Sequence, residues 1–188
     1  MGHTPDWTLR GRRVGLCRPG EEDEQELLAL RRESADFHAP WEPEPTPGRD
    51  PYGPEAFALS LARSRQPSDE HNLVRRLEDG LLVGAVNLSN IARGIQQSAS
   101  MGWWVGRPHA GQGYLTEAVG LALTRAFDEL GLHRVEANIQ PGNAPSLALA
   151  RRAGFLREGY SPRFLRIAGA WRDHERWALT LEDWQTRR

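Results

Sequence analysis

The stretch from Ser98 to Glu129 reads SASMGWWVG, RPHAGQG and YLTEAVGLALTRAFDE. Its first part is apolar and aromatic with small residues between, which is typical of a buried strand. Its last part, continued by one residue, places apolar side chains at helical spacing. These are Leu115, Val119, Ala122, Leu123, Ala126, Phe127 and Leu130. We therefore expect a central strand and a helix, joined by a turn that contains Gly111 and Gly113.

The order of strand, glycine turn and helix start is suited to binding phosphate. The first backbone N–H groups of a helix have no partner inside it, and the helix dipole makes that end partly positive. Glycines let the backbone approach a ligand closely. Taken alone, however, Gly-x-Gly favours the simpler interpretation of an ordinary tight turn before a helix, so a second signal is needed.

That signal lies in a segment that follows the central helix. A short strand from His133 to Ile139 precedes a Pro141-Gly142 turn, and Asn143 then stands where a helix N-cap is expected. Gly154 ends this short helix, because glycine is favoured just past a helix C-terminus. The segment therefore predicts strand, turn and capped helix.

Four short motifs in these segments are shared with one known family. Residues 111–118 read GQGYLTEA, residues 134–137 read RVEA, Asn143 and Ser146 form Asn-x-x-Ser, and residues 153–155 read Ala-Gly-Phe. In this combination the sequence resembles the GCN5-related N-acetyltransferase (GNAT) family, and in particular its Rim branch, which acetylates the N-termini of ribosomal proteins.

The resemblance extends over nearly the whole chain, because residues 37–43 (FHAPWEP) and 171–174 (WRDH) also match the Rim type. It implies an α/β fold with a mixed, mostly antiparallel sheet of six to seven strands, splayed at its centre and flanked by about four helices. One GNAT domain would span residues 1–188.

Composition sets further bounds on the chain. A length of 188 residues fits one domain, and a net charge of −1 gives no reason to expect binding to nucleic acid. Cys17 is the single cysteine, which excludes an internal disulfide or a cysteine-rich metal site and suggests a small buried residue. We expect no metal, no membrane span and a cytoplasmic protein; the sequence leaves open whether it forms a homodimer.

The remaining elements are predicted from periodicity and turn residues. We expect one strand from Thr8 to Arg18 with a bend near Gly11, and an irregular proline-rich loop from Phe37 to Pro54. Helices are expected at Glu22–Ser34 and Glu55–Arg65. Strands are expected at His71–Leu77 and Leu81–Leu88, joined at Asp79-Gly80, and from Phe155 to Tyr160. A break at Pro162 then precedes hairpin arms at Arg163–Ile167 and Trp171–Leu181, joined at Ala168-Gly169.

Acetyl-CoA is the co-substrate that the resemblance implies. Its pyrophosphate is expected on the backbone N–H groups of Gly111 to Leu115, and its pantetheine arm along Trp104 to Gly106, bonded like an added strand. Asn143 would bond the pantetheine, or would only cap its helix; an amide can do both. The cofactor-binding candidates are Trp104, Val105, Gly106, Arg107, Gly111, Gln112, Gly113, Tyr114, Leu115, Thr116, Asn143 and Ser146.

Direct attack of an amine on the thioester needs an oxyanion donor and a proton for the leaving thiolate. The resemblance implies a backbone N–H of the central strand as the donor, here Val105. Many family members place a Tyr four residues after the position of Ser146, where this chain has Ala150. In the Rim branch a Ser at position 146 is the proposed proton donor, so Ser146 is our candidate, with a purely capping role as the alternative.

The catalytic base is harder to assign, because the strand position where Rim enzymes can carry a Glu falls here on Leu165. Glu136 is our candidate; His174 is another, and Glu158 fits a solvated or ion-paired residue better. An α-amine titrates near ~7.7–8.0 and a lysine amine near ~10.4, so deprotonating lysine at neutral pH costs about 3 kcal/mol more. A site without a strong base therefore suits an α-amine, with water removing the proton.

The acceptor site is expected between the proline-rich loop, the helix after it and the last hairpin. Glu42 and Glu44 would attract a cationic amine, and Trp41, Tyr52 and Trp171 would form an aromatic wall. Trp41 could instead pin the loop to the core. The substrate-binding candidates are Trp41, Glu42, Tyr52, Trp171 and His174.

The predicted function is acetyl-CoA-dependent N-acetylation of a primary amine, with the α-amine of a protein N-terminus as the first acceptor class. A small amine, such as an antibiotic or polyamine, is the second. A third hypothesis is a non-catalytic acyl-CoA sensor, because Ala150 and the missing base remove two expected catalytic groups.

Overall fold

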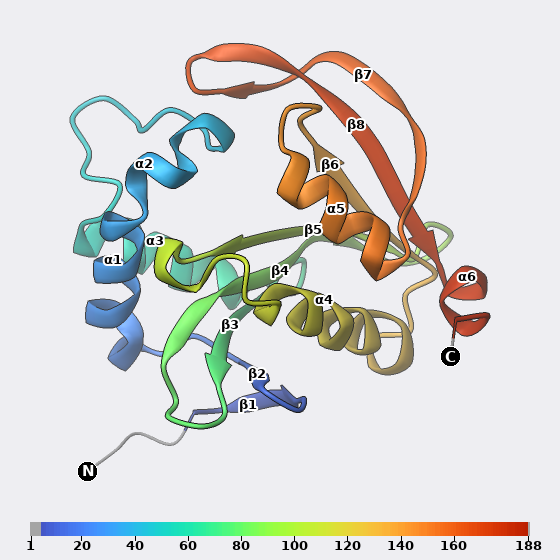
Figure 1. Cartoon of the computed structure of the whole chain (residues 1–188), viewed down its shortest axis with the longest axis horizontal. Helices are drawn as coiled ribbons and strands as arrows, with labels where there is room; N and C mark the ends of the chain where they lie inside the picture. Colours follow the sequence, from blue (N-terminus) through green and yellow to red (C-terminus); the bar gives the residue numbers. More distant parts are fainter. Residues whose placement is uncertain (1–4, 188) are drawn as a thin grey trace.

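The computed structural model describes residues 5–187, in which eight strands form one sheet (Figure 1). The strand order is β1-β2-β3-β4-β5-β6-β8-β7, and β5–β6 is the parallel pair among antiparallel neighbours. The strands are β1 Trp7–Arg10, β2 Val14–Cys17, β3 Glu70–Arg76, β4 Leu82–Ala92, β5 Ser98–Val105, β6 Arg134–Ile139, β7 Leu156–Ile167 and β8 Ala170–Thr180.

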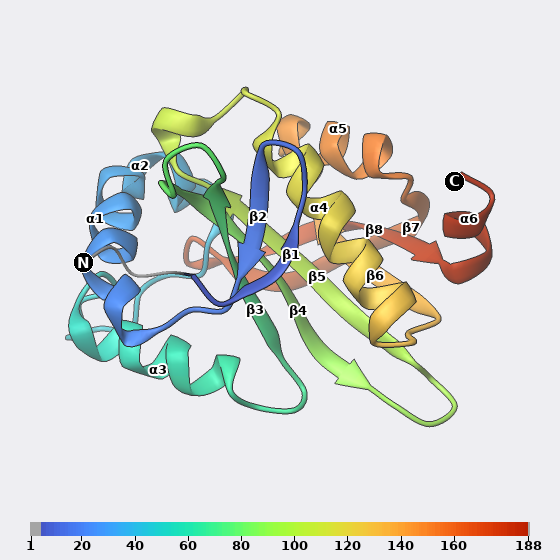
Figure 2. The same cartoon turned by 90° about the horizontal axis from the view of Figure 1, so that it is seen from below.

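Helices cover both faces of this sheet (Figure 2), with α4 and α5 on one face and α1 and α3 on the other. The α-helices are α1 Glu24–Glu33, α2 Ala35–His38, α3 Pro54–Ser64, α4 Tyr114–Thr124, α5 Ala144–Ala153 and α6 Leu181–Gln185. Short 3-10 turns are η1 Glu21–Asp23, η2 Ala39–Trp41 and η3 Arg107–His109, and α4 continues as the π-helical turn η4 Arg125–Glu129. Within residues 5–187 no helix combines the length and hydropathy needed to cross a bilayer.

The larger core cluster lies under α4, whose predicted apolar stripe is buried. Val119, Leu123, Ala126 and Phe127 are at most 4% exposed. On the opposite face, Cys17 packs in a smaller cluster with the α1 side chains, and burial raises the pKa of its thiol to about 12. The prediction of a small buried cysteine is confirmed.

The sheet parts at its centre, between β5 and β6. These strands pair only where Ser98 to Ser100 lie beside Arg134 to Glu136, although both continue beyond that point. The predicted splayed, mixed sheet is therefore confirmed, with eight strands rather than six to seven.

The prediction of a single strand from Thr8 to Arg18 is wrong, because this segment folds back as the β1–β2 hairpin. The Glu117 carboxylate of α4 accepts the backbone N–H groups of Arg12, Arg13 and Val14, and so fixes the turn. A Cβ at Gly11 would come within 2.4 Å of the Glu117 Oε1 atom, which explains the glycine there.

Two expectations about proline are also corrected. Pro162 does not interrupt β7, because the register shift between Ser161 and Leu165 places it in a bulge. β7 pairs only with β8 at the edge of the sheet, where the missing N–H of proline disrupts no ladder. The proline-rich loop also begins with regular structure, since α2 and η2 cover residues up to Trp41.

Candidate functional site

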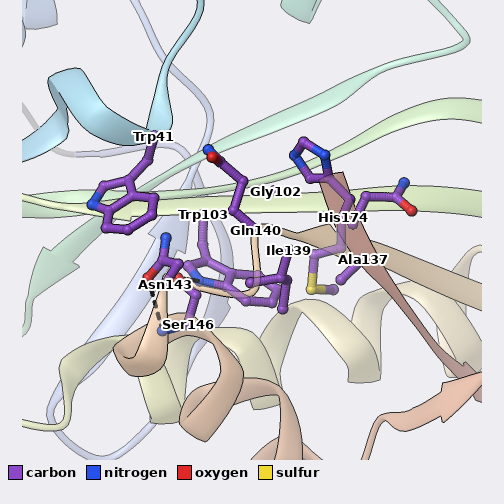
Figure 3. Close-up of a pocket in the computed structure, with 11 residues that line it drawn as sticks. Trp41, Gly102, Trp103, Ala137, Ile139, Gln140, Asn143, Ser146 and His174 are labelled. Atoms are coloured by element: carbon purple, nitrogen blue, oxygen red, sulfur yellow. Dashed lines mark hydrogen bonds between the residues drawn. The ribbon is translucent and has the colours of Figure 1, made fainter. Parts of the chain in front are cut away.

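A pocket lies where β5 and β6 separate (Figure 3), and its volume is about 220 Å³. Figure 3 shows Trp41 on one side and His174 on the other, with Asn143 and Ser146 at the start of α5. The lining is Trp41, Met101, Gly102, Trp103, Ala137, Asn138, Ile139, Gln140, Asn143, Ser146 and His174. None of these described lining residues is an aspartate or a glutamate.

The edge of β5 that faces the split carries backbone groups without a strand partner. Gly106 donates its N–H to the Val83 carbonyl at 2.8 Å, and Val105 lies opposite Gly84. Since alternate residues of an antiparallel pair bond across it, the N–H groups of Trp103 and Val105 point away from β4. The structure thus directs the Val105 N–H toward the split.

The other residues of the predicted pantetheine stretch are oriented differently. The alternation directs the backbone of Trp104 toward β4, and its ring packs against the α1 side. Gly106 lies so close to Leu30 that an added Cβ would come within 2.4 Å of Cδ1. The N–H of Arg107 donates to the Ser34 hydroxyl at 2.9 Å. Their backbone N–H groups are therefore engaged within the protein.

The turn before α4 has the geometry of an anion cradle. Gly111 and Gly113 have φ angles of 74° and 80°, which glycine adopts without strain. Among residues 5–187, no backbone carbonyl accepts the N–H groups from Gly111 to Leu115. The N–H of Thr116 already donates to the Gly113 carbonyl at 3.2 Å. The predicted donors from Gly111 to Leu115 are thus left without a backbone acceptor within the described residues, and Thr116 has only its hydroxyl left.

Two arginines that sequence reasoning missed lie beside this cradle. Arg13 donates to the Gln112 carbonyl at 3.1 Å, and its guanidinium carbon lies 4.5 Å from the Tyr114 ring centre. The guanidinium groups of Arg76 and then Arg13 lower the pKa of Tyr114. Arg76 is also paired with Asp79. They come from the β1–β2 turn and β3, so no local motif links them to the glycine turn.

The start of α5 combines a helix cap with a pocket hydroxyl. Asn143 Oδ1 accepts the Ser146 N–H at 3.2 Å, so the predicted cap is confirmed. The indole N–H of Trp103 donates to the Ser146 hydroxyl oxygen at 3.3 Å. Because that oxygen accepts, the hydroxyl hydrogen can point to another acceptor. Ala150, one turn further, is fully buried.

The structure distinguishes between the candidates for the catalytic base. Glu136 lies outside the pocket lining, and its carboxylate accepts from Arg134 at 2.7 Å. Arg134 also pairs with Glu158, and this contact lowers the pKa of the Glu158 carboxyl. His174 does line the pocket, is 3% exposed and has Nδ1 3.0 Å from the Arg172 carbonyl oxygen. The geometry therefore gives Glu136 no support as a base and confirms Glu158 as an ion-paired residue.

The acceptor candidates are only partly brought together. Trp41 and His174 line the pocket, whereas Glu42, Tyr52 and Trp171 do not. The Glu42 carboxylate is held by Arg31 at 2.7 Å, so the expectation that it attracts a cationic amine is not supported. Trp171 is 63% exposed on β8. Among the described residues no group of three or more His, Cys, Asp or Glu is placed to hold a metal ion.

Comparisons with known proteins agree with this geometry. The sequence profile of the acetyltransferase (GNAT) domain matches residues 13–156. "Probable N-acetyltransferase YjcK" of Bacillus subtilis is 34% identical over 180 residues, covering 93% of this chain and 98% of that protein. The Escherichia coli "[Ribosomal protein uS5]-alanine N-acetyltransferase" is 38% identical over 103 residues, covering 55% of this chain and 53% of that protein.

Among solved structures, Mycobacterium smegmatis RimJ in complex with CoA-disulfide superimposes with a TM-score of 0.83. It is 31% identical in sequence, and the match covers 90% of this chain and 83% of that one. The similarity thus extends across both halves of the split sheet.

Proposed function

Because the chain belongs to the GNAT family and is an acetyl-CoA-dependent N-acetyltransferase, we propose that its acceptor is the α-amine of a protein N-terminus. The names of two relatives support this acceptor class: one acetylates an alanine of ribosomal protein uS5, and the other is RimJ. The observation that carries the proposal is the chemistry of the pocket in the split.

The pocket is lined by aromatic, amide and hydroxyl groups, with His174 as its one titratable side chain among the described residues. A polyamine keeps additional cationic amines at neutral pH, and these need carboxylates to hold them once water is removed. The negative charge of Glu42 is already neutralised by Arg31, which donates to both of its oxygens. An α-amine has a pKa of about 7.7–8.0 and is partly neutral without a strong base. The lining therefore favours an α-amine over a polyamine.

In the proposed reaction, the amine nitrogen attacks the thioester carbon of acetyl-CoA and forms a C–N bond. The Val105 N–H, which faces the split, stabilises the oxyanion. The C–S bond then breaks, and the thiolate takes a proton from the Ser146 hydroxyl. Water accepts a proton from the new ammonium and returns one to Ser146, so the products are the amide and free CoA thiol.

The cofactor's pyrophosphate would lie on the N–H groups of Gly111 to Leu115, which no backbone carbonyl of the described residues accepts, with Arg13 adding positive charge beside them. Asn143 keeps its amide NH2 group for the pantetheine, because only its oxygen is used in the cap. The pantetheine arm would bond the free edge of β5 at Trp103 and Val105.

A thiol-release assay tests the acceptor class. Peptides with a free N-terminal alanine are compared with N-terminally blocked peptides of the same sequence that contain a lysine, and with spermidine. We expect CoA release with the free peptides only, and mass spectrometry should place the acetyl group on the α-amine. Turnover of spermidine with no reaction of any peptide would refute the proposed acceptor.

Replacing Ser146 with alanine is expected to lower kcat by about 10- to 100-fold, because the thiolate loses its proton donor. The Kd of acetyl-CoA should change little, since the backbone cradle is untouched. Steady-state kinetics and calorimetry measure the two effects. Ser146→Thr keeps the hydroxyl and serves as the control; full activity in Ser146→Ala would reduce Ser146 to a capping residue.

A further inference from the structure

A chain of hydrogen bonds runs from the acceptor loop to the free end of β5. The Glu42 carboxylate accepts both guanidinium NH2 groups of Arg31, at 2.7 and 2.8 Å. Arg31 Nη1 lies 3.1 Å from His38 Nδ1, and His38 Nε2 lies 2.8 Å from the Val105 carbonyl oxygen. The loop after η2, α1 and α2 are thus linked in series to one residue of the central strand, which His38 contacts.

Only one form of His38 satisfies both of its contacts. A guanidinium only donates, so Nδ1 must accept; a carbonyl only accepts, so Nε2 must carry the hydrogen. The ring is 6% exposed, and burial, together with the positive charge of Arg31, lowers the pKa of His38, while Glu42 and the Val105 carbonyl act in the opposite direction. His38 is therefore neutral, with its hydrogen on Nε2.

Aromatic contacts fix the ring in this orientation. The His38 ring meets the Trp104 ring edge-on at 5.7 Å between centroids, and Phe37 lies at 5.3 Å on a tilted plane. The Arg31 guanidinium carbon lies 4.9 Å from the centre of the same Trp104 ring. The imidazole is thus held both by hydrogen bonds at its nitrogens and by aromatic contacts with Phe37 and Trp104.

We call the hydrogen-bonded set of Glu42, Arg31 and His38 the clamp. The position of Val105 explains why this clamp is useful. The N–H and C=O of one strand residue point to the same edge of the sheet, and on this edge β6 has already separated. The Gly106 N–H, in the same planar peptide unit as the Val105 carbonyl, donates to Val83 on the β4 side, but on the split side no strand bonds Val105. His38 takes the carbonyl and leaves the N–H of the same residue directed into the split.

The Glu42 end of this hydrogen-bond chain lies next to the pocket. Glu42 follows Trp41, which lines the pocket, and the Glu42 carbonyl accepts the Ala168 N–H from the β7–β8 turn at 2.9 Å. The side chain of Glu42 thus connects the loop beside the pocket to Arg31, and through His38 to β5.

We infer that His38 is a positioning residue for acyl transfer: it aims the Val105 N–H at the acetyl thioester and connects it, through Arg31 and Glu42, to the acceptor loop. This inference rests on the proposed function, in which the Val105 N–H stabilises the oxyanion. The hydrogen-bonded clamp itself requires no particular acceptor.

The test uses acetyl-CoA labelled with 13C at the thioester carbonyl, so that it needs no amine. A donated hydrogen bond moves this carbonyl resonance downfield when acetyl-CoA binds the wild-type enzyme. His38→Leu should lose most of that shift while the acetyl-CoA Kd stays within about threefold, because the phosphate cradle is intact. His38→Gln offers a donor and an acceptor and should retain more of the shift than His38→Leu. His133→Gln, at an exposed histidine paired with Glu182, is the matched control and should equal the wild type.

Turnover gives the second readout. At saturating acetyl-CoA, His38→Leu should lower kcat by about 10- to 100-fold, in line with the loss of an oriented donor. If this variant does not fold, Glu42→Ala removes both acceptors of the Arg31 guanidinium at the far end of the hydrogen-bond chain and should reduce the carbonyl shift. An unchanged carbonyl shift in whichever of these two variants folds would overturn the inference while leaving the acceptor proposal standing. Turnover with spermidine alone would overturn the acceptor class and leave the clamp intact.

Discussion

Replacing Gly113 with glutamate is expected to raise the acetyl-CoA Kd by roughly 100- to 1000-fold. Gly113 has a φ of 80° and precedes the first residue of α4, and a side chain in this conformation costs about 1–2 kcal/mol. The new carboxylate would stand among N–H groups meant for phosphate. Two like charges about 4 Å apart near a protein surface repel by about 4 kcal/mol. Isothermal calorimetry with acetyl-CoA measures the loss.

Gly94 provides a matched control for this prediction. It also has a positive φ, of 70°, and open space around its Cβ position, but it lies in the turn between β4 and β5, where Arg93 contacts Leu130 at the opposite, C-terminal end of the α4–η4 helix. Gly94→Glu should therefore suffer a similar backbone strain without changing the acetyl-CoA Kd. Equal losses in both variants would show that backbone strain, and not the phosphate site, causes the effect. Unchanged affinity in Gly113→Glu would exclude the cradle.

The sequence predicts the centre of the fold well because local and global signals agree there. The apolar run to Val105, the two glycines and the helical stripe of α4 each favour the structure that forms. Asn143 and Gly154 likewise carry their own capping preferences, and both cap α5 as expected. Where a residue type encodes its own conformation, no knowledge of distant contacts is required.

The sequence fails where a role depends on distant partners. Arg13 reaches Gln112 across 99 positions, and His38 reaches Val105 across 67. The sequence makes Glu136 a candidate base, but in the structure its carboxylate accepts a hydrogen bond from Arg134, two residues away on the same strand. Single residues such as these have no periodicity or turn signal, so only the fold reveals whether a charged group is free or paired.

Another long-range pair leads to the largest expected loss of stability. Asp23 and Arg75 are 4% and 8% exposed, and Arg75 Nη2 donates to the Asp23 carboxylate at 2.6 Å. Asp23 also accepts the Gly20 N–H at 2.7 Å. Removing one partner of a buried pair leaves the other charge without its counterion, at a cost of about 3–5 kcal/mol. Because Glu26 also contacts Arg75 at 2.7 Å, we expect Asp23→Ala to lie near the lower end, about 3 kcal/mol.

Urea unfolding of the wild type and variants measures this loss as the change in free energy of unfolding. Asp79→Ala removes the carboxylate of the exposed Arg76 pair and should cost much less, because water screens exposed charges. Asp23→Asn keeps the shape and an oxygen for the Gly20 N–H, but its amide NH2 then faces the Arg75 guanidinium, so its loss combines the charge with the hydrogen bond to Arg75. If Asp23→Ala were no less stable than Asp79→Ala, the Arg75 guanidinium would have to be solvated or held by Glu26 and the Gly80 carbonyl. The packing of α1 on β3 would then owe its stability to the apolar cluster that contains Leu30 and Leu73.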